Sequence, residues 1–346
     1  TPIWDIPLPA VTICSPNQVR PSRFDYFAYK NQLNLTERDQ TTLQYIMMTC
    51  KYSSNGNDSK VLTADFLDQM YYNIFDLCEV MINIEWMSKE MKEPCLLIER
   101  IFTPAGACFT FNSLPRKQLF GPIHSHINYW VHEMESNKTE EAVWSPDRGY
   151  KNKSNFESRP WRTAGRSHDE DVSFQLFIDT EDFDQTCHSR NDGFWVTVHS
   201  PAELPTQWHP MTFVSTDQLS HIKVIPEIKK TKEELRKWDP EVRGCYFEDE
   251  RPLLFFNYYT EKNCYLECES QTSLSRCGCV PFYLPRIREK PVCGPANQEC
   301  YKQVIGNIAK SLDPDTSNCD CLPSCFETEY KISVAKFPKE FSFSSV

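Results

Sequence analysis

The cysteines constrain this chain more than any other feature of its sequence. It has 16 cysteines in 346 residues, and ten of them lie between Cys245 and Cys325. A reducing cytosol rarely accommodates so many thiols, whereas exported proteins pair them as disulfides. The even number also permits complete pairing. We therefore expect an extracellular protein in which a densely cross-linked segment, 245–325, is attached to a larger body.

Composition and charge exclude several other classes. The chain is 40% hydrophobic and 25% charged, a globular mixture and not a disordered one. Its net charge of −11 argues against a nucleic-acid partner, because binding to phosphates requires clustered cations. The sequence contains neither an apolar run of membrane-spanning length nor a signal peptide. We expect it to be a piece of a longer protein that carries it out of the cytosol.

Four N-x-S/T sequons favour the same compartment. They are Asn34, Asn57, Asn137 and Asn152. In an exported protein such sites accept N-linked glycans on surface loops.

Apolar periodicity predicts a body that mixes helices and strands. We expect two helical segments, one from about Ser22 and a longer one over Thr63–Met91, whose apolar residues recur at three- and four-residue steps. The expected strands are Ala10–Ile13, Val172–Ile178 and Phe194–His199, the last preceded by a turn at Asn191–Gly193. The polar stretch from His132 to Arg166 reads as surface loop.

A run of acidic residues lies between Ser167 and Ser189, where no Lys or Arg occurs. Its members are Asp169, Glu170, Asp171, Asp179, Glu181, Asp182 and Asp184. Such carboxylates could bind a cation, although the run lacks EF-hand spacing. The alternative is the solvated edge of a hairpin.

The spacing within 245–325 favours disulfides over zinc, because no C-x2-C knuckle is present. Cys264 and Cys268 would share one face of a helix, and Cys319 and Cys321 one face of a strand. Docking the two antiparallel would give the nested bridges Cys264–Cys321 and Cys268–Cys319. A second helix is expected over 301–312. Spacing alone leaves about 945 pairings of ten cysteines open.

Several motifs occur in an order that resembles one family. They are LPAVTIC (Leu8–Cys14), ACFTFN (Ala107–Asn112), VTVHSPAELP (Val196–Pro205), CYLECESQTSLSRCGCVPFYLPR (Cys264–Arg286) and CDCLPSC (Cys319–Cys325). Together with the cysteine ladder they resemble the degenerin/epithelial sodium channel family, and most of all its insect pickpocket branch. The resemblance extends from Leu8 to about Tyr330.

The resemblance implies an α+β fold. Its β-sheet palm and β-ball core would carry a helical finger and a disulfide-rich, two-helix thumb. The implied segments are 1–15 for the wrist and first palm strand, 16–106 for the finger and knuckle-side helices, 107–244 for the palm, β-ball and finger loops, 245–325 for the thumb and 326–346 for the palm return segment. The family's membrane helices and final palm strand would lie outside this sequence.

The resemblance also implies a disulfide pattern. The pairs are Cys14–Cys108, Cys78–Cys95, Cys245–Cys325, Cys264–Cys321, Cys268–Cys319, Cys277–Cys300 and Cys279–Cys293. Two cysteines, Cys50 and Cys187, lie outside this common set, and we predict that they bridge each other.

The function implied is the extracellular gating or ligand-sensing domain of a trimeric, sodium-permeable, amiloride-sensitive type of channel at the plasma membrane. Its partners would be two further subunits, the membrane and an unidentified stimulus, with sodium as permeant ion and no cofactor beyond N-linked glycans. The alternative is a secreted or cell-surface disulfide-rich module that binds a ligand without a pore.

An enzyme is not expected. The sequence has no H-E-x-x-H or G-x-S-x-G motif. His124 and His126 could ligate a metal together, but a solvated loop is the commoner setting for such a pair.

The sequence departs from the proton-gated relatives at the thumb. There the second thumb helix carries carboxylates, whereas Tyr301–Leu312 contains no acid and has Lys302 and Gly306 at those places. A Trp that relatives place three residues before the first thumb cysteine is Val242 here. The resemblance therefore does not carry the family's proton-sensing residues over to this chain.

Overall fold

A computed structural model defines the fold. It describes residues 2–32, 34–50, 61–70, 76–121, 143–152, 159–163, 171–179, 181–184, 187, 192–206, 209–310 and 319–338. Within these ranges, no helix has both the length and the apolar character needed to cross a membrane.

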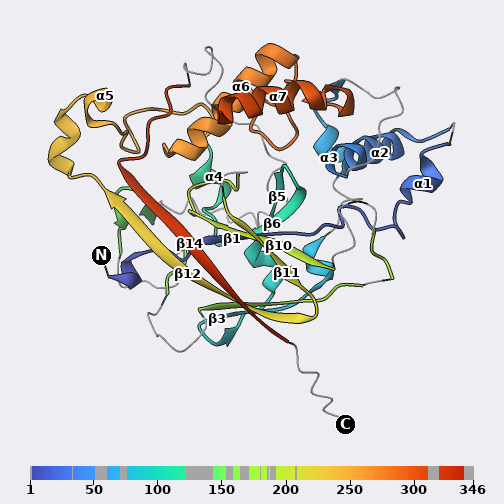
Figure 1. The fold of residues 1–346 in the computed structure, drawn as a ribbon, viewed down its shortest axis with the longest axis horizontal. Coiled ribbons are helices and arrows are strands. Elements are labelled where there is room, and N and C mark those ends of the chain that lie inside the picture. The colour runs from blue at the N-terminus through green and yellow to red at the C-terminus, as the bar shows by residue number, and fades with distance from the viewer. Residues whose placement is uncertain are drawn as a thin grey trace, which may run out of the picture.

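An antiparallel five-stranded sheet forms the centre of the molecule (Figure 1). Its strands, in spatial order, are β11 (Met211–Ser215), β10 (Gly193–His199), β1 (Ala10–Cys14), β6 (Gly106–Phe111) and β5 (Ile98–Thr103). On one face Ile13 lies opposite Phe109 and Val196, and these side chains share an apolar cluster. On the other face Cys14 lies opposite Cys108 and belongs to the larger core beneath the helices. Because successive side chains of a strand point to opposite faces, each strand contributes apolar residues to the clusters on both faces of the sheet.

A long two-stranded ribbon crosses this sheet. It pairs β12 (Gln218–Lys230) with β14 (Phe326–Pro338) in a continuous antiparallel register from Gln218↔Pro338 to Lys230↔Phe326. Figure 1 shows the ribbon running diagonally over the sheet. Tyr330 of β14 donates its hydroxyl to the carbonyl of Pro7 at 2.9 Å, so the ribbon is tied to the segment that precedes β1.

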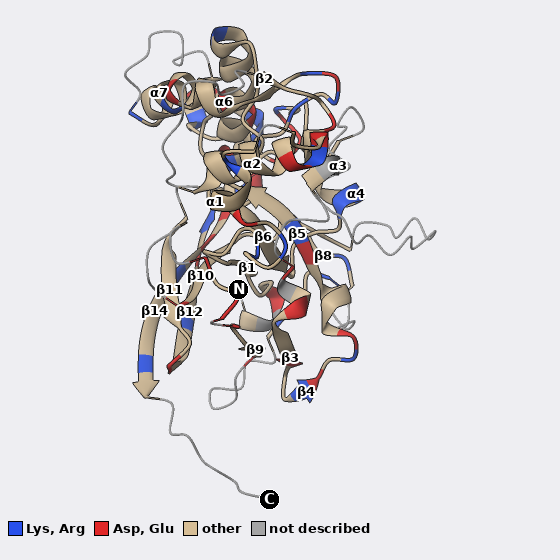
Figure 2. Cartoon of the chain, turned by 90° about the vertical axis from the view of Figure 1, so that its right-hand side faces the viewer, with Lys and Arg blue, Asp and Glu red and all other residues tan. Residues whose placement is uncertain are grey.

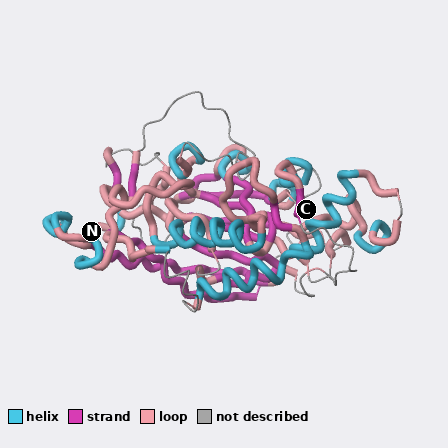
Figure 3. The backbone as a smooth tube through the Cα atoms, turned by 90° about the horizontal axis from the view of Figure 1, so that it is seen from above, coloured by secondary structure: helices cyan, strands magenta, loops and turns pink. Residues whose placement is uncertain are grey.

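Two helices of the cysteine-dense segment lie together on one side of the sheet. α6 spans Glu261–Cys277 and α7 spans Gln298–Ala309. The Thr260 hydroxyl caps the start of α6 by accepting from the amide of Asn263 at 3.1 Å. Gly278, with φ +71°, ends the helix in the left-handed conformation. Seen from above, these helices lie over the strands (Figure 3).

A second helical group surrounds α2 (Glu37–Thr49), which begins with a capping box between Thr36 and Asp39. The other helices are short: α1 (Tyr26–Tyr29), α3 (Phe66–Met70), α4 (Arg116–Leu119) and α5 (Pro240–Arg243), with 3-10 turns at Ile3–Asp5, Leu77–Glu79, Pro94–Leu97, Glu233–Lys237 and Pro295–Asn297. The remaining strands pair locally: β2 (Val61–Leu62) with β13 (Val292–Cys293), β3 (Met81–Trp86) with β4 (Lys89–Glu90) and β9 (Val172–Leu176), and β7 (Trp144–Ser145) with β8 (Gly149–Tyr150).

The long helix expected over Thr63–Met91 is wrong. Only α3 is α-helical among its described residues, and 81–90 forms a hairpin whose strand β3 pairs with β9. Met87 and Ser88 adopt positive φ at the turn, which no helix tolerates. Within β3, Ile84 is fully buried while Ile82 is exposed, so alternation and cross-strand pairing override the apparent helical spacing.

Two other expectations need correction. The helix expected from Ser22 starts at Tyr26, and Asp25 is its cap. The strands on either side of the acidic run belong to different sheets, because β9 pairs with β3 and β10 pairs with β1 and β11. The acidic run is therefore not the edge of a single hairpin.

The architecture is α+β, as expected, with its helices on one side of mainly antiparallel strands. Figure 2 shows the helices gathered at one end and the ribbon extending away from them, with acidic and basic residues interspersed over both parts. The site described next lies where these two parts meet.

Candidate functional site: the junction of the helices and the ribbon

Disulfides cross-link both parts of the molecule. Two lie outside residues 245–325, Cys14–Cys108 and Cys50–Cys187. Five lie within 245–325 and join it into one unit: Cys245–Cys325, Cys264–Cys321, Cys268–Cys319, Cys277–Cys300 and Cys279–Cys293. In the two nested bridges that join α6 to 319–321, the Cα atoms are 5.7 Å apart. Cys277–Cys300 then links α6 to α7. We refer to residues 245–325 as the helical unit.

The predicted bridge between Cys78 and Cys95 is absent, since both cysteines are free. They are nevertheless neighbours, and burial, a hydrogen bond with Cys95 and the Asp76 carboxylate raise the pKa of the Cys78 thiol.

The segment that carries Cys319 and Cys321 is not the expected strand. Residues 319–323 are irregular, and Asp320 has a positive φ of 48°. The predicted bridges form nevertheless. In this irregular segment Cys319 and Cys321 still face Cys268 and Cys264 of α6.

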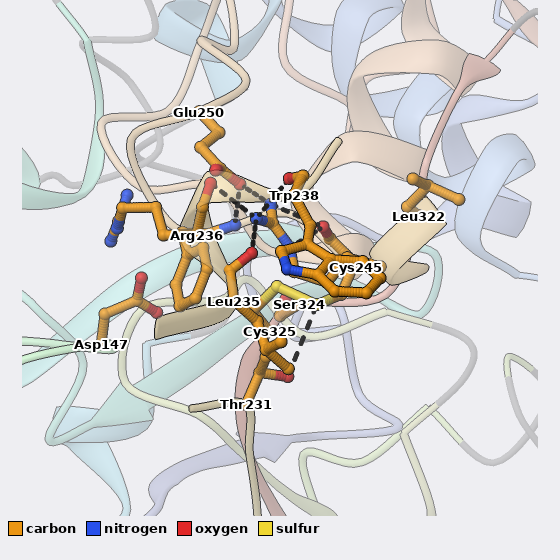
Figure 4. Close-up of a disulfide and its surroundings, with 12 residues drawn as sticks. Asp147, Thr231, Leu235, Arg236, Trp238, Cys245, Glu250, Leu322, Ser324 and Cys325 are labelled. Carbon is orange, nitrogen blue, oxygen red and sulfur yellow. Dashed lines mark hydrogen bonds and ion pairs between the residues drawn. A yellow bond between two sulfur atoms is a disulfide. The ribbon is translucent and has the colours of Figure 1, made fainter. Parts of the chain in front are cut away.

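The bridge Cys245–Cys325 lies where the ribbon meets the helical unit (Figure 4). Thr231, just after β12, donates its amide to the carbonyl of Cys325 at 2.8 Å. The amide of Cys325 donates to the carbonyl of Tyr246 at 2.8 Å. The amide of Tyr246 donates to the carbonyl of Pro323 at 3.0 Å. Both ribbon strands and both ends of the helical unit therefore meet within one hydrogen-bonded group.

Arg243 fixes the segment that connects β12 to the helical unit, residues 232–244, which we call the arm. Its side chain is 2% exposed and forms an ion pair with Glu250. The guanidinium also donates to the carbonyls of Leu235, Arg236, Trp238 and Cys245 at 3.1–3.3 Å. A planar guanidinium with five donors can satisfy such a group of acceptors, whereas an ammonium cannot. The Arg243 guanidinium thus ties together carbonyls of the arm, although Trp238 and Val242 are half or more exposed.

The β7–β8 hairpin docks on the start of the helical unit through a reciprocal pair. Glu248 donates its amide to the Asp147 carboxylate at 2.8 Å, and Asp147 donates its amide to the Glu248 carboxylate at 3.0 Å. Burial, together with the nearby Glu248 charge, raises the pKa of Asp147 to about 7 against the opposing effect of the Glu248 amide. This junction therefore contains a carboxyl group that titrates near neutral pH.

A buried charged cluster forms a second contact between the parts. Lys262, in the first turn of α6, lies 3.5 Å from Glu203 in the turn after β10 and 3.9 Å from Glu327 of β14. The side chains of Glu203 and Glu327 are 6% and 9% exposed. Burial opposes ionisation of Glu203, but Lys262 and His209 outweigh it and lower the pKa to about 2. Three elements far apart in sequence are thus joined by charge.

His199 supports this cluster from the end of β10. Its ring nitrogens lie 2.8 Å from the Thr12 hydroxyl and 3.0 Å from the Ser200 carbonyl. Burial, then the nearby His209, lowers the pKa of His199 to about 3, so the ring stays neutral. The hydrogen bond to Thr12 joins β10 to β1, and the one to Ser200 fixes the ring against its own segment.

The acidic run does not assemble into one cation site among its described residues. Asp171 accepts from the Thr163 hydroxyl, whereas Asp182 accepts from the amide and hydroxyl of Ser22 at 2.8 and 2.6 Å. Asp179 accepts from the amide of Glu181 at 3.1 Å. Asp184 lies near Cys50 and Cys187, but their sulfurs are bonded to each other and cannot ligate a metal as thiolates. Asp169 and Glu170 lie outside the described residues.

Of the predicted glycan sites and the His124/His126 pair, some lie within the described residues and some outside them. Asn34 and Asn152 lie at exposed positions, as glycan attachment requires. Asn57 and Asn137, like His124 and His126, lie outside the described residues.

Sequence reasoning predicted the Cys245–Cys325 bridge but missed the polar and charged residues around it. His199 and Glu203 lie within the motif VTVHSPAELP, which could have marked them. Arg243 and Lys262 carry no local signal, because their partners are carbonyls and carboxylates that only the fold brings near.

Comparison with known proteins identifies the class. The chain matches the family described as amiloride-sensitive sodium channel over residues 1–346. It belongs to this family, whose members are ion channels and not enzymes.

Individual relatives agree. The chain is 28% identical to pickpocket protein 28 of Drosophila melanogaster over 96% of its own length and 53% of that protein. It is 24% identical to pickpocket protein 19 of the same species over 96% of its length and 64% of that protein. It is 28% identical to human acid-sensing ion channel 2 over 43% of its length and 28% of that protein. The chain thus spans about half the length of the first of these relatives.

Proposed function

We propose that this chain is the extracellular gating or ligand-sensing domain of a trimeric, sodium-permeable, amiloride-sensitive type of channel at the plasma membrane. Two further subunits and a membrane pore would complete the channel. The domain assignment follows the family plan: 1–15 as wrist and first palm strand, 16–106 as finger and knuckle side, 107–244 as palm, β-ball and finger loops, 245–325 as thumb, and 326–346 as palm return segment.

The observation that supports this function best is the junction at Cys245–Cys325. The ends of the helical unit are covalently joined there, and the ends of β12 and β14 are hydrogen-bonded to the same group. A movement of the helical unit would therefore reach both ribbon strands at one point. In a channel, the ribbon and the arm would carry it onward to the membrane segments.

Stiffness makes such transmission efficient. Five disulfides lie within residues 245–325, and each limits local unfolding of the segment it closes. Ligand energy would then move the helical unit as a body instead of being dissipated within it. The net charge of −11 fits a cation channel, because an acidic surface raises the local concentration of cations.

Voltage-clamp recording of the full-length subunit tests the proposal. A panel of protons, peptides, osmotic and mechanical stimuli, applied with and without amiloride, should evoke a sodium current that amiloride blocks. Serine substitution of both Cys268 and Cys319 should uncouple stimulus from current without preventing surface delivery. A full-length protein that reaches the surface and carries no cation current under any stimulus would instead favour a ligand-binding module without a pore.

A further inference from the structure

Lys262 is the half-buried cation through which α6 meets two other elements. Its ammonium lies 3.5 Å from a carboxylate oxygen of Glu203 and 3.9 Å from one of Glu327. Glu203 belongs to the turn that follows β10, and Glu327 is the second residue of β14. One side chain of the helical unit thus neutralises carboxylates from both the central sheet and the ribbon.

The cluster depends on Lys262 more than on its other partners. His209 also faces Glu203 at 3.5 Å, but its Nδ1 accepts from the amide of Thr206 at 3.0 Å. Because Nδ1 is occupied as an acceptor, Nε2 is the ring nitrogen that faces Glu203. Among the lysines and arginines of the described residues, Lys262 is the one paired with Glu203.

Glu327 has a second cation, which approaches from solvent. Lys229 of β12 lies 2.9 Å from Glu327, and its side chain is 64% exposed. Lys229 therefore pairs β12 with β14 inside the ribbon, whereas Lys262 pairs the ribbon with α6. The two lysines share one carboxylate and differ in what they join, so they form a matched comparison.

Lys262 also has room to leave its partners. Its contacts of 3.5 and 3.9 Å are ion pairs longer than ordinary hydrogen bonds. The side chain lines a cavity of about 420 Å³, whose wall also includes His209, Tyr330 and Lys331. The flexible four-carbon stem of a lysine can swing into such a space. The cavity therefore offers space beside the contact into which the ammonium could move.

Separation of this contact would leave buried charge with fewer partners. Glu203 and Glu327 are both buried, and a buried carboxylate that loses a cation is destabilised. Glu327 would keep Lys229, whereas Glu203 would keep His209 at 3.5 Å. A shift of α6 away from β14 would break both Lys262 pairs together.

We propose that Lys262 is an electrostatic latch that holds the first turn of α6 against β14 and the turn after β10, and that its release frees β14 when the helical unit moves. The latch itself is a property of this chain. Its role in gating rests on the proposed channel function.

Hydrogen exchange on the whole disulfide-bonded chain tests the latch. Lys262→Met keeps the apolar stem and removes the charge, and it should speed amide exchange in 327–332 and 261–266 by about tenfold or more. Lys229→Met, the matched control, should change these rates by less than about threefold because its ammonium is 64% exposed and it leaves Lys262 in place.

Exchange in 327–332 that stays within about threefold of native in Lys262→Met, with all seven disulfides intact, would overturn the latch. An equal effect from Lys229→Met would also overturn the latch.

In the full-length channel, Lys262→Met should shift the stimulus concentration for half-maximal current by about threefold or more. If amide exchange in 327–332 is faster but the stimulus concentration for half-maximal current is unchanged, the gating role is overturned and the latch is not. A native protein without any current would count against the channel function and leave the exchange result standing.

Discussion

The amide of Thr231 donates to the carbonyl of Cys325 at 2.8 Å, although 93 residues of sequence lie between them. Thr231 is the first residue after β12, and Cys325 is the last before β14. The disulfide to Cys245 adds the start of the helical unit to the same point. The ribbon and the helical unit are therefore not independently mobile where they meet.

The arm should depend on Arg243. Replacement by Met removes the donors to four carbonyls and leaves Glu250 without its cation, so we expect a loss of about 3–5 kcal/mol in the free energy of unfolding. Arg243→Lys should recover only part of this, because an ammonium lacks the planar fork. Denaturant unfolding monitored by fluorescence measures both variants.

Arg148 provides the control for Arg243. It is 74% exposed and pairs with Glu248 at 3.6 Å, so Arg148→Met should cost less than about 1 kcal/mol. Equal losses for Arg243→Met and Arg148→Met would show that the carbonyl clamp does not stabilise the arm.

The docking of the β7–β8 hairpin should weaken as pH rises through neutrality. Asp147 has a pKa of about 7 in the fold, above its ordinary value near 3.8. A pKa raised by folding gives stability that is complete below the unfolded value and is lost as pH rises through the folded one. Amide exchange of 144–150 should therefore accelerate between pH 6 and 8 beyond its intrinsic pH dependence, and Asp147→Asn should abolish the excess. The same excess in Asp147→Asn would assign it to another group.

Glu269 should make α6 sensitive to more alkaline pH. Its side chain is buried, and burial raises its pKa to about 8, so the carboxyl is protonated at neutral pH. By the same linkage, its contribution to stability is lost as pH rises through about 8. Glu269→Gln should flatten the dependence of unfolding free energy on pH between 7 and 9. A slope as steep as that of the native chain would contradict this assignment.

The sequence predicted local features where a single pattern determined them. The strand at Ala10–Ile13 and the helix carrying Cys264 and Cys268 follow from alternation and helical spacing, and both are present. The hairpin at 81–90 was missed, because its apolar spacing also fits a helix and only pairing with β9 decides between them. Tertiary context overrode periodicity there.

The charged partners around the Cys245–Cys325 bridge could not be predicted, for a different reason. Arg243 is recognised by four backbone carbonyls, which leave no trace in residue identity. Lys262 meets Glu203 and Glu327 across 59 and 65 residues of sequence, and a single sequence offers no way to pair them. Ion-pair partners at such separations are set by the fold. The spacing of Cys264 and Cys268, by contrast, is a local pattern that predicts a shared helix face.

The most direct test concerns the covalent junction itself. In the full-length channel, Cys245→Ser with Cys325→Ser should reduce stimulus-evoked current per surface molecule by about tenfold or more. The matched control, Cys50→Ser with Cys187→Ser, removes a disulfide outside the junction and should retain most of its current. Current per surface molecule in the Cys245/Cys325 variant equal to that of the native channel would contradict the claim that the helical unit acts on the ribbon through this bridge.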